Sequence, residues 1–180
     1  MHGIIHLELQ KFVIGRYGEQ AWSELTRRAD LSGEIITPLK VYPDEHLLRL
    51  VKVASELTEV PILDLLEAFG EALVPAYVTL YGALLKPEWR TLDVIEHTEE
   101  TIHRVVRMRQ PGAEPPRLYA QRTRKDEVVL TYDSPRKLCA VARGIGRGLA
   151  NHFAERLTIS ESSCMHRGDP SCSIAFRVIR

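Results

Sequence analysis

The stretch "VVLTYDSPRKLC", residues 128–139, joins a strand pattern to a polar face. Residues 128–130 predict a strand, and Tyr132, Ser134 and Arg136 follow at every second position. Because successive side chains of an extended chain alternate between two faces, these three side chains point in one direction. Two hydroxyls and one guanidinium on one face, with no acidic side chain among them, predict a binding site for an anion. A planar anion such as a carboxylate suits the guanidinium best.

Length and composition predict one domain over residues 1–180, built as two lobes, with 44% hydrophobic residues to form its core. The 24 basic and 24 acidic residues balance, so we expect no nucleic-acid partner and no membrane partner. No apolar run reaches the roughly 20 residues of a membrane span, and the start "MHGIIHLELQ" lacks the pattern of a signal peptide. The three cysteines cannot all pair within the chain, which favours a cytoplasmic protein with free thiols or a bound metal.

Apolar residues near the helical period dominate the first part of the chain, so residues 1–60 are expected to form a helical N-terminal lobe. Asp44 is a candidate N-cap, and Pro61 is expected to open a helix because proline suits a first helical turn. Residues 74–88 have a mixed pattern. The predicted helices cover residues 3–17 and 19–29, a segment from 44, a segment from 61, and residues 91–109, with 30–43 as a loop.

Residues 61–180 are expected to form a second lobe, with a small antiparallel sheet and helices, which makes the fold class α+β. The predicted strands cover residues 117–123, 127–133, 157–162 and 172–179, and a helix is predicted over about 135–157. Gly144, Gly146 and Gly148 lie inside this helix, where each costs up to about 1 kcal/mol relative to alanine. Such glycines favour close approach by another element or by a flat ligand.

His103 lies among apolar residues in the predicted helix 91–109. Neutral imidazole on a rigid helix is a common iron ligand in haem proteins. The chain has seven histidines, and a core histidine with a satisfied proton is the alternative reading of this one. Haem carries two propionates on one edge, so a helical histidine together with Tyr132, Ser134 and Arg136 would suit a buried haem.

The stretch "YDSPR" also fits the Y-x-S-x-R signature of the H-NOX family, the haem-nitric oxide/oxygen-binding domains related to the sensor domain of soluble guanylate cyclase. The chain resembles this family over essentially its whole length. Further similar segments are "MHGII" at the start, "AW" at 21–22, "LLEAFG" at 65–70, "IHRVV" at 102–106 and "PGAEPPRL" at 111–118.

This resemblance implies a haem b buried between the two lobes. It implies His103 as the proximal iron ligand and Tyr132, Ser134 and Arg136 as partners of the propionates. It also implies that Pro116 lies against the porphyrin, where the family uses a proline to keep the ring distorted.

The distal side of the haem decides which gas binds. Oxygen-binding relatives carry a distal tyrosine, and the matching position here is Val141. An apolar wall offers bound oxygen no hydrogen bond, whereas nitric oxide binds ferrous iron without one. We therefore expect binding of nitric oxide and carbon monoxide and exclusion of oxygen, with Tyr77 as the one hydroxyl that resembles a distal aromatic group. The expected distal wall consists of Ile5, Leu9, Leu73, Val141 and Ile145.

The three cysteines allow a second metal site. "SSCMHRGDPSC" places Cys164 and Cys172 around a turn, and Cys139 follows "YDSPR". The alternatives are unrelated reduced thiols or a tetrahedral zinc site with three thiolates. Some bacterial family members resemble the zinc arrangement but have histidine where this chain has Glu161, so the fourth ligand could be Glu161, His166 or water. Such a site is expected to be structural and open to oxidation.

The function that follows is gas sensing without catalysis. In the family, nitric oxide weakens the iron–His103 bond, which would let the first helices shift as a two-state switch. Resemblance to stand-alone bacterial members implies a separate partner, such as a histidine kinase or a cyclic-di-GMP enzyme. One alternative is a haem-free redox sensor that uses the zinc–thiolate site. A haem peroxidase is disfavoured because it needs a distal acid–base pair, and "CMHRGDPSC" resembles the cysteine turn of the 4-vinyl reductase family, a small-molecule binding module.

Overall fold

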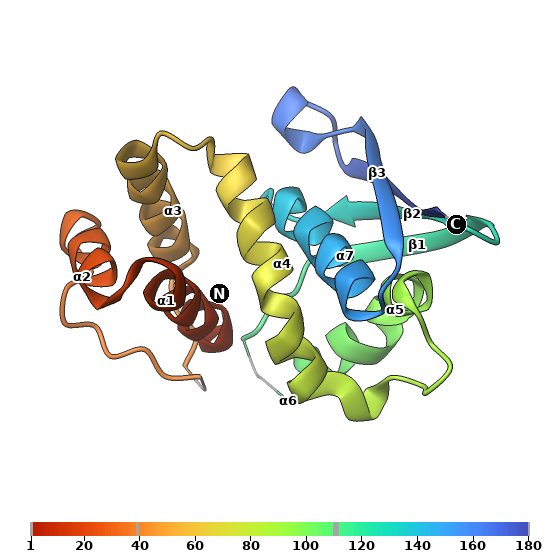
Figure 1. The fold of residues 1–180 in the computed structure, drawn as a ribbon, viewed down its shortest axis with the longest axis horizontal. Coiled ribbons are helices and arrows are strands. Elements are labelled where there is room, and N and C mark those ends of the chain that lie inside the picture. Colours follow the sequence, from red (N-terminus) through yellow and green to blue (C-terminus); the bar gives the residue numbers. More distant parts are fainter. Residues whose placement is uncertain (1, 39, 110–111, 180) are drawn as a thin grey trace.

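The structure, a computed structural model, describes residues 2–38, 40–109 and 112–179 and has the expected α+β fold. In Figure 1 the first three helices form one end of the molecule, the sheet forms the other, and α4 runs between them. The helices are α1 (Gly3–Tyr17), α2 (Glu19–Arg28), α3 (Asp44–Thr58), α4 (Ile62–Tyr81), α5 (Thr91–Thr98), α6 (Arg104–Arg109) and α7 (Cys139–His152). Short helical turns are η1 (Gly82–Leu84), η2 (Glu99–His103) and η3 (Met165–Arg167). Among the described residues, no helix combines the length and apolar character needed to cross a membrane.

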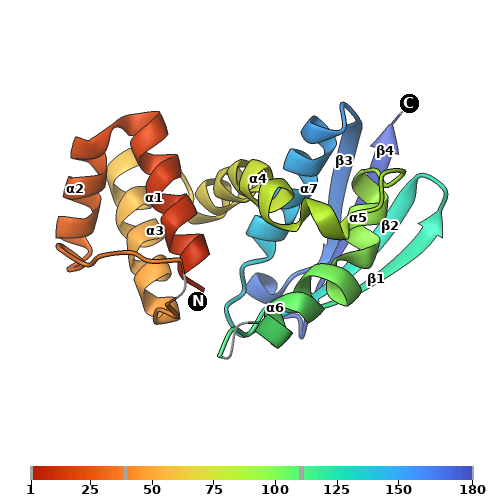
Figure 2. The ribbon, with the colours of Figure 1, turned by 90° about the horizontal axis from the view of Figure 1, so that it is seen from below.

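Four antiparallel strands form one sheet in the order β1-β2-β4-β3. The strands are β1 (Arg117–Arg124), β2 (Glu127–Asp133), β3 (Arg156–Ser163) and β4 (Cys172–Ile179). The central strand β2 buries Val128, Leu130 and Tyr132 on one face, as the period of two dictates. Helices α5 and α7 lie alongside the sheet in Figure 2, and their apolar residues share a core with this face.

Two clusters of buried side chains form the core, and α4 contributes to both. One cluster joins α1, α2 and α3 to Leu66, Phe69 and Leu73 of α4. The other joins the sheet, α5 and α7 to Val74 of the same helix. Helix α4 therefore connects the helical lobe to the sheet lobe, because different residues of its surface pack into the two clusters.

Glycines bring α4 and α7 into backbone contact. A Cβ atom on Gly144 of α7 would overlap the carbonyl oxygen of Glu67, and one on Gly70 of α4 would overlap that of Val141. Gly146 instead lies against the ring of Phe176 on β4. The expectation that the glycines of this helix permit close approach is confirmed.

Several predicted boundaries were wrong. Residues 74–81, expected to be mixed, continue α4 through Pro75, because Val74 and its neighbours remain packed in the core. The helix predicted over 135–157 is shorter, Cys139–His152, because Ala154 adopts a left-handed conformation with φ 55° that ends it. Asp44 is the first residue of α3 rather than its cap, which is Pro43.

Candidate functional site

A cavity of about 250 Å³ lies where α1, α4, α5, α6, α7 and the first two strands meet. Most of its lining is aliphatic or aromatic. Among the described lining residues, those with ionic or imidazole side chains are His2, His103, Glu114 and Arg136. Such a site suits a large apolar ligand that carries a few polar groups at defined positions.

His103 reaches the cavity from η2, a π-helical turn that interrupts the helix predicted over 91–109. Its Nδ1 atom lies 2.9 Å from Oε2 of Glu99, and only 14% of its side chain is exposed. Burial lowers the pKa of His103, although Glu99 and the backbone of Pro116 act in the opposite direction. The site therefore favours a neutral imidazole, which is the form that binds a metal. π-Helical turns occur often at functional sites.

Tyr132 and Ser134 are buried and Asp133 between them is exposed, as the predicted alternation requires. Strand β2 ends at Asp133, however, so Arg136 lies in the turn that follows the strand and not on an extended face. Tyr132 and Arg136 line the cavity. Ser134 lies outside the lining and accepts a hydrogen bond from the backbone N–H of Arg136 at 3.3 Å. Burial raises the pKa of Tyr132 to about 12, so its hydroxyl keeps its proton and can donate a hydrogen bond.

Arg136 has an acidic neighbour that its local sequence does not reveal. Its Nε atom donates to Oδ2 of Asp44 at 2.6 Å, across 92 residues of chain, and its Nη1 atom donates to the carbonyl oxygen of Glu114. Burial raises the pKa of Asp44, but hydrogen bonds and charges that include Arg136 outweigh it, so the pKa lies below its usual value. The expectation of an acid-free face was wrong because Asp44 arrives from α3, not from the strand.

All the other residues that the sequence predicted to contact the haem line the cavity, except Leu9. Leu9 lies instead in the core of the helical lobe. Lining residues that were not predicted include Phe69 and Tyr81, which share one stripe of α4 with Leu73 and Tyr77 at intervals of four residues. That helical period was the sequence signal that could have identified them. The predicted residues that line the cavity are Ile5, Leu73, Tyr77, Pro116, Val141 and Ile145.

Tyr77 brings a hydroxyl into this apolar region. Burial raises its pKa well above the usual value, and its ring lies edge-on to that of Tyr81, with centroids 6.0 Å apart. Within the part of the chain that the structure describes, its hydroxyl makes no hydrogen bond. Tyr77 is therefore a lining residue whose hydroxyl is available to donate a hydrogen bond to a ligand, as is that of Tyr81.

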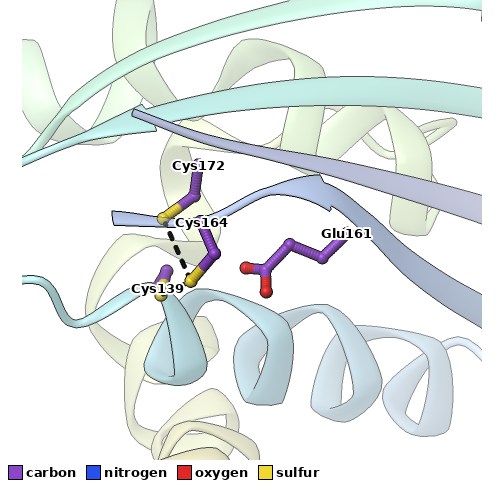
Figure 3. A group of neighbouring side chains, drawn as sticks. All are labelled: Cys139, Glu161, Cys164 and Cys172. Atoms are coloured by element: carbon purple, nitrogen blue, oxygen red, sulfur yellow. Dashed lines mark hydrogen bonds between the residues drawn. The ribbon is translucent and has the colours of Figure 1, made fainter. Parts of the chain in front are cut away.

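The three cysteines meet at a second site, where α7 begins and where β3 and β4 join (Figure 3). All three are free and buried, with Sγ of Cys164 3.8 Å from that of Cys139 and 3.9 Å from that of Cys172. The carboxylate of Glu161 completes a group whose ligand atoms all lie within 4.8 Å of one another. Burial raises the pKa of the Cys139 and Cys172 thiols, so the site favours protonated thiols unless a cation is present.

The candidates for a fourth ligand differ in position. His166 is exposed, and its Nε2 atom lies 2.7 Å from the carbonyl oxygen of Lys137, outside the cysteine group. Glu161 is in the group but pairs with Arg143 at 3.2 Å and Arg167 at 3.7 Å. A metal bound here would share the carboxylate of Glu161 with two arginines.

Comparisons with known proteins agree with this geometry. The sequence profile of the Haem-NO-binding family (HNOB) matches residues 2–161, and the chain therefore belongs to this family of H-NOX domains. A crystal structure of an H-NOX protein from S. oneidensis in the Fe(II)NO ligation state is similar at a TM-score of 0.93, with 26% identity and 100% coverage of both chains. No curated protein matches this chain in sequence.

Two other solved structures extend the similarity. An NMR structure of a Shewanella oneidensis H-NOX domain in the Fe(II)CO ligation state has a TM-score of 0.89 and 26% identity, covering 100% of this chain and 99% of that chain. A crystal structure of an Fe(II) unliganded H-NOX protein from K. algicida has the same TM-score at 23% identity, covering 100% and 97%, which shows a shared fold.

Haem is the cofactor that this family binds, and the residues present fit it. The apolar lining matches a porphyrin, the neutral imidazole of His103 matches an axial ligand, and Arg136 with Tyr132 matches the acidic edge. The described residues of the cavity are therefore of the types that a bound haem requires.

Proposed function

We propose that this domain is a haem-based gas sensor that binds nitric oxide and carbon monoxide at ferrous haem b. The supporting observation is that one mostly apolar cavity is lined both by the imidazole of His103, which is hydrogen-bonded to Glu99, and by the guanidinium of Arg136. Bound ferrous haem supplies an open coordination position for a diatomic gas. His103 would hold the iron, while Tyr132 and Arg136 would hold the propionates and Ser134 would position the backbone of Arg136.

The wall of the cavity supports selection against oxygen. Ile5, Leu73, Val141 and Ile145 line it with hydrocarbon alone, so they offer no hydrogen bond to the negative charge of bound oxygen. Tyr77 is the residue that could change this outcome, because its protonated hydroxyl lies in the same lining. We expect the reduced protein in air to oxidise without a long-lived oxygen complex, and a stable oxygen spectrum lost in Tyr77→Phe would assign oxygen binding to that hydroxyl.

The proposed switch uses the division of the chain into a helical lobe, residues 1–60, and a haem-ligating lobe, residues 61–180. Pro116 and Ile5 line the cavity from the two lobes, so a change in ring shape or position would reach both. The output would go to a separate cytoplasmic signalling protein, such as a histidine kinase or a cyclic-di-GMP enzyme, and three free buried thiols suit a reducing compartment.

Absorption spectra test the proposal. The purified ferrous protein should show a Soret band that shifts with nitric oxide and with carbon monoxide. His103→Gly should lose the haem or the native spectrum and regain it with added imidazole, while His152→Ala, an exposed control, should behave as wild type. A wild-type protein reconstituted with haemin that shows no haem binding would refute the proposal.

The cysteine group supports a second candidate function, a zinc site that is sensitive to oxidation. Three buried thiols and one carboxylate within 4.8 Å of one another form a donor set that suits a tetrahedral divalent ion. We expect one equivalent of zinc in protein purified in metal-free buffer and less in Cys164→Ser. Zinc well below one equivalent in the wild type would remove this candidate, and a protein without a Soret band but with zinc would favour the haem-free redox sensor.

A further inference from the structure

Glu99 lies where the proposed axial ligand, α6 and β1 meet. Its Oε2 atom is 2.9 Å from Nδ1 of His103 and 3.3 Å from the backbone nitrogen of Leu118, the second residue of β1. Its Oε1 atom accepts a hydrogen bond from the guanidinium of Arg107 on α6. One carboxylate thus joins the imidazole to a helix and to the sheet.

These contacts determine which nitrogen of His103 carries the proton. A peptide N–H and a guanidinium can only donate, so the Glu99 carboxylate acts as the acceptor in both bonds. The same carboxylate must also accept from the imidazole, which places the proton on Nδ1. In a neutral ring this leaves the lone pair on Nε2, the atom available to a metal in the cavity that His103 lines.

The carboxylate is also fixed in place. Glu99 and His103 are the first and last residues of the π-helical turn, and the N–H of Arg104 bonds to the carbonyl oxygen of Glu99. The bond from Leu118 anchors the side chain to the sheet, so rotation of the ring is restricted from two directions. A partner held this rigidly acts on the orientation and on the basicity of a ligand.

We infer that Glu99 is a positioning residue for the axial ligand: it holds His103 as the Nδ1–H tautomer and strengthens the donation of Nε2 to haem iron. This inference rests on the proposed function. A carboxylate partner makes an imidazole a stronger donor than a neutral partner does. With haem bound, Glu99 would therefore stabilise the ferric relative to the ferrous state and would oppose release of His103 in the nitric oxide complex.

Glu99→Gln tests the inference, with Glu100→Gln as the matched control. Glutamine keeps the size of the side chain and an acceptor oxygen but removes the charge, while Glu100 is an exposed glutamate one residue away in the same turn. In haem-loaded Glu99→Gln, the iron–histidine stretching frequency should fall, the midpoint potential should rise, and a larger share of the nitric oxide complex should be five-coordinate. Glu100→Gln should match the wild type in all three.

The outcomes separate the inference from the proposed function. If wild type binds haem and both gases but Glu99→Gln leaves the stretching frequency and the potential unchanged, the inference fails and the gas sensor remains. If wild type binds no haem, the proposed function fails first.

If Glu99→Gln does not fold, nitrogen-15 spectra of the histidine rings in the wild-type ferrous carbon monoxide complex provide the test. An Nδ1 chemical shift moved from that of a neutral imidazole toward that of an imidazolate, as a strong hydrogen bond to a carboxylate produces, supports the inference, and an Nδ1 shift equal to that of an ordinary neutral imidazole overturns it. The backbone of Pro116 also favours a proton on this ring. No side-chain substitution removes the carbonyl of Pro116. Glu99→Gln therefore measures only the effect that Glu99 itself has on His103.

Discussion

His6 is a buried histidine that should limit the stability of the fold in acid. It is 2% exposed, and neither ring nitrogen has a hydrogen-bond partner among the described residues. Burial is the largest cause that lowers its pKa from 6.5 to about 4. The charge of His46 acts in the same direction, while the nearby backbone of His2 and the charge of Glu34 favour the protonated ring. The unfolded state therefore binds a proton at a higher pH than the folded state does. The contribution of neutral His6 to the free energy of unfolding is therefore fully present above about pH 6.5 and is lost as the pH falls toward 4.

His6→Phe should reduce this loss, because phenylalanine has no proton to bind and can keep the ring contact with Tyr42, whose centroid lies 4.9 Å from that of His6. Each unit of pKa corresponds to about 1.4 kcal/mol. From pH 7 to pH 4, wild type should therefore lose on the order of 3 kcal/mol more of its free energy of unfolding than His6→Phe does. Urea unfolding at several pH values measures it. Parallel pH profiles for wild type and variant would contradict the prediction.

At the scale of single residues, sequence periodicity predicted which side chains share a face, but it could not predict their distant partners. The burial of Tyr132 and Ser134 on either side of exposed Asp133 follows from the alternation of an extended chain, whereas the turn that carries Arg136 does not. The pairing of Arg136 with Asp44 depends on how two lobes pack, which local sequence does not encode. Leu9 was misplaced because it shares a helix face with Ile5, and that face passes from the cavity into the core.

At the scale of elements, the contact between α4 and α7 should be the packing interface least tolerant of added volume. Gly144→Ala would push a methyl group into the carbonyl oxygen of Glu67, which belongs to a rigid helix backbone and cannot move aside. Overpacking of this kind costs about 1–3 kcal/mol. We expect the free energy of unfolding to fall by that amount in urea titrations.

Gly15→Ala is the matched control, because Gly15 lies exposed inside α1 with nothing near its missing Cβ. Alanine is the better helix former, so this variant should gain about 0.5–1 kcal/mol. A lower free energy of unfolding for Gly144→Ala and a higher one for Gly15→Ala would show that the loss comes from contact between the helices and not from helix propensity. Equal gains in both proteins would show that α4 and α7 are not in close contact at Gly144.

Most helices and all four strands could be predicted because their apolar periods are regular. The failures occur where tertiary packing overrides a local signal. The mixed pattern of residues 74–88 hid the second half of α4, whose core contacts continue on both sides of Pro75. The π-helical turn at Glu99–His103 leaves no mark in the apolar pattern, since it adds only one residue to a helical turn.

For the whole molecule, sequence predicted the α+β class but not the order of the strands or the link between the lobes. Strand order depends on β4 inserting between β2 and β3, a long-range choice that alternation does not determine. The lobes meet through α4, through the cavity and through the bond from Arg136 to Asp44. That bond connects the polar face of the cavity to the first turn of α3, so it couples the proposed anion site to the position of the helical lobe.

Asp44→Asn should weaken this coupling. The two side chains are 31% and 15% exposed, so the pair is partly shielded from water and its loss should cost about 1 kcal/mol. Asp126→Asn is the control: it removes a pair with Arg177 in which both side chains are more than 40% exposed, and unfolding should not change measurably. If Asp44 holds the helical lobe against the cavity, Asp44→Asn should also speed amide hydrogen exchange at the start of α3, while Asp126→Asn leaves it unchanged. Equal effects of the two substitutions would mean that the pair is only a surface contact and that the lobes are joined by α4 alone.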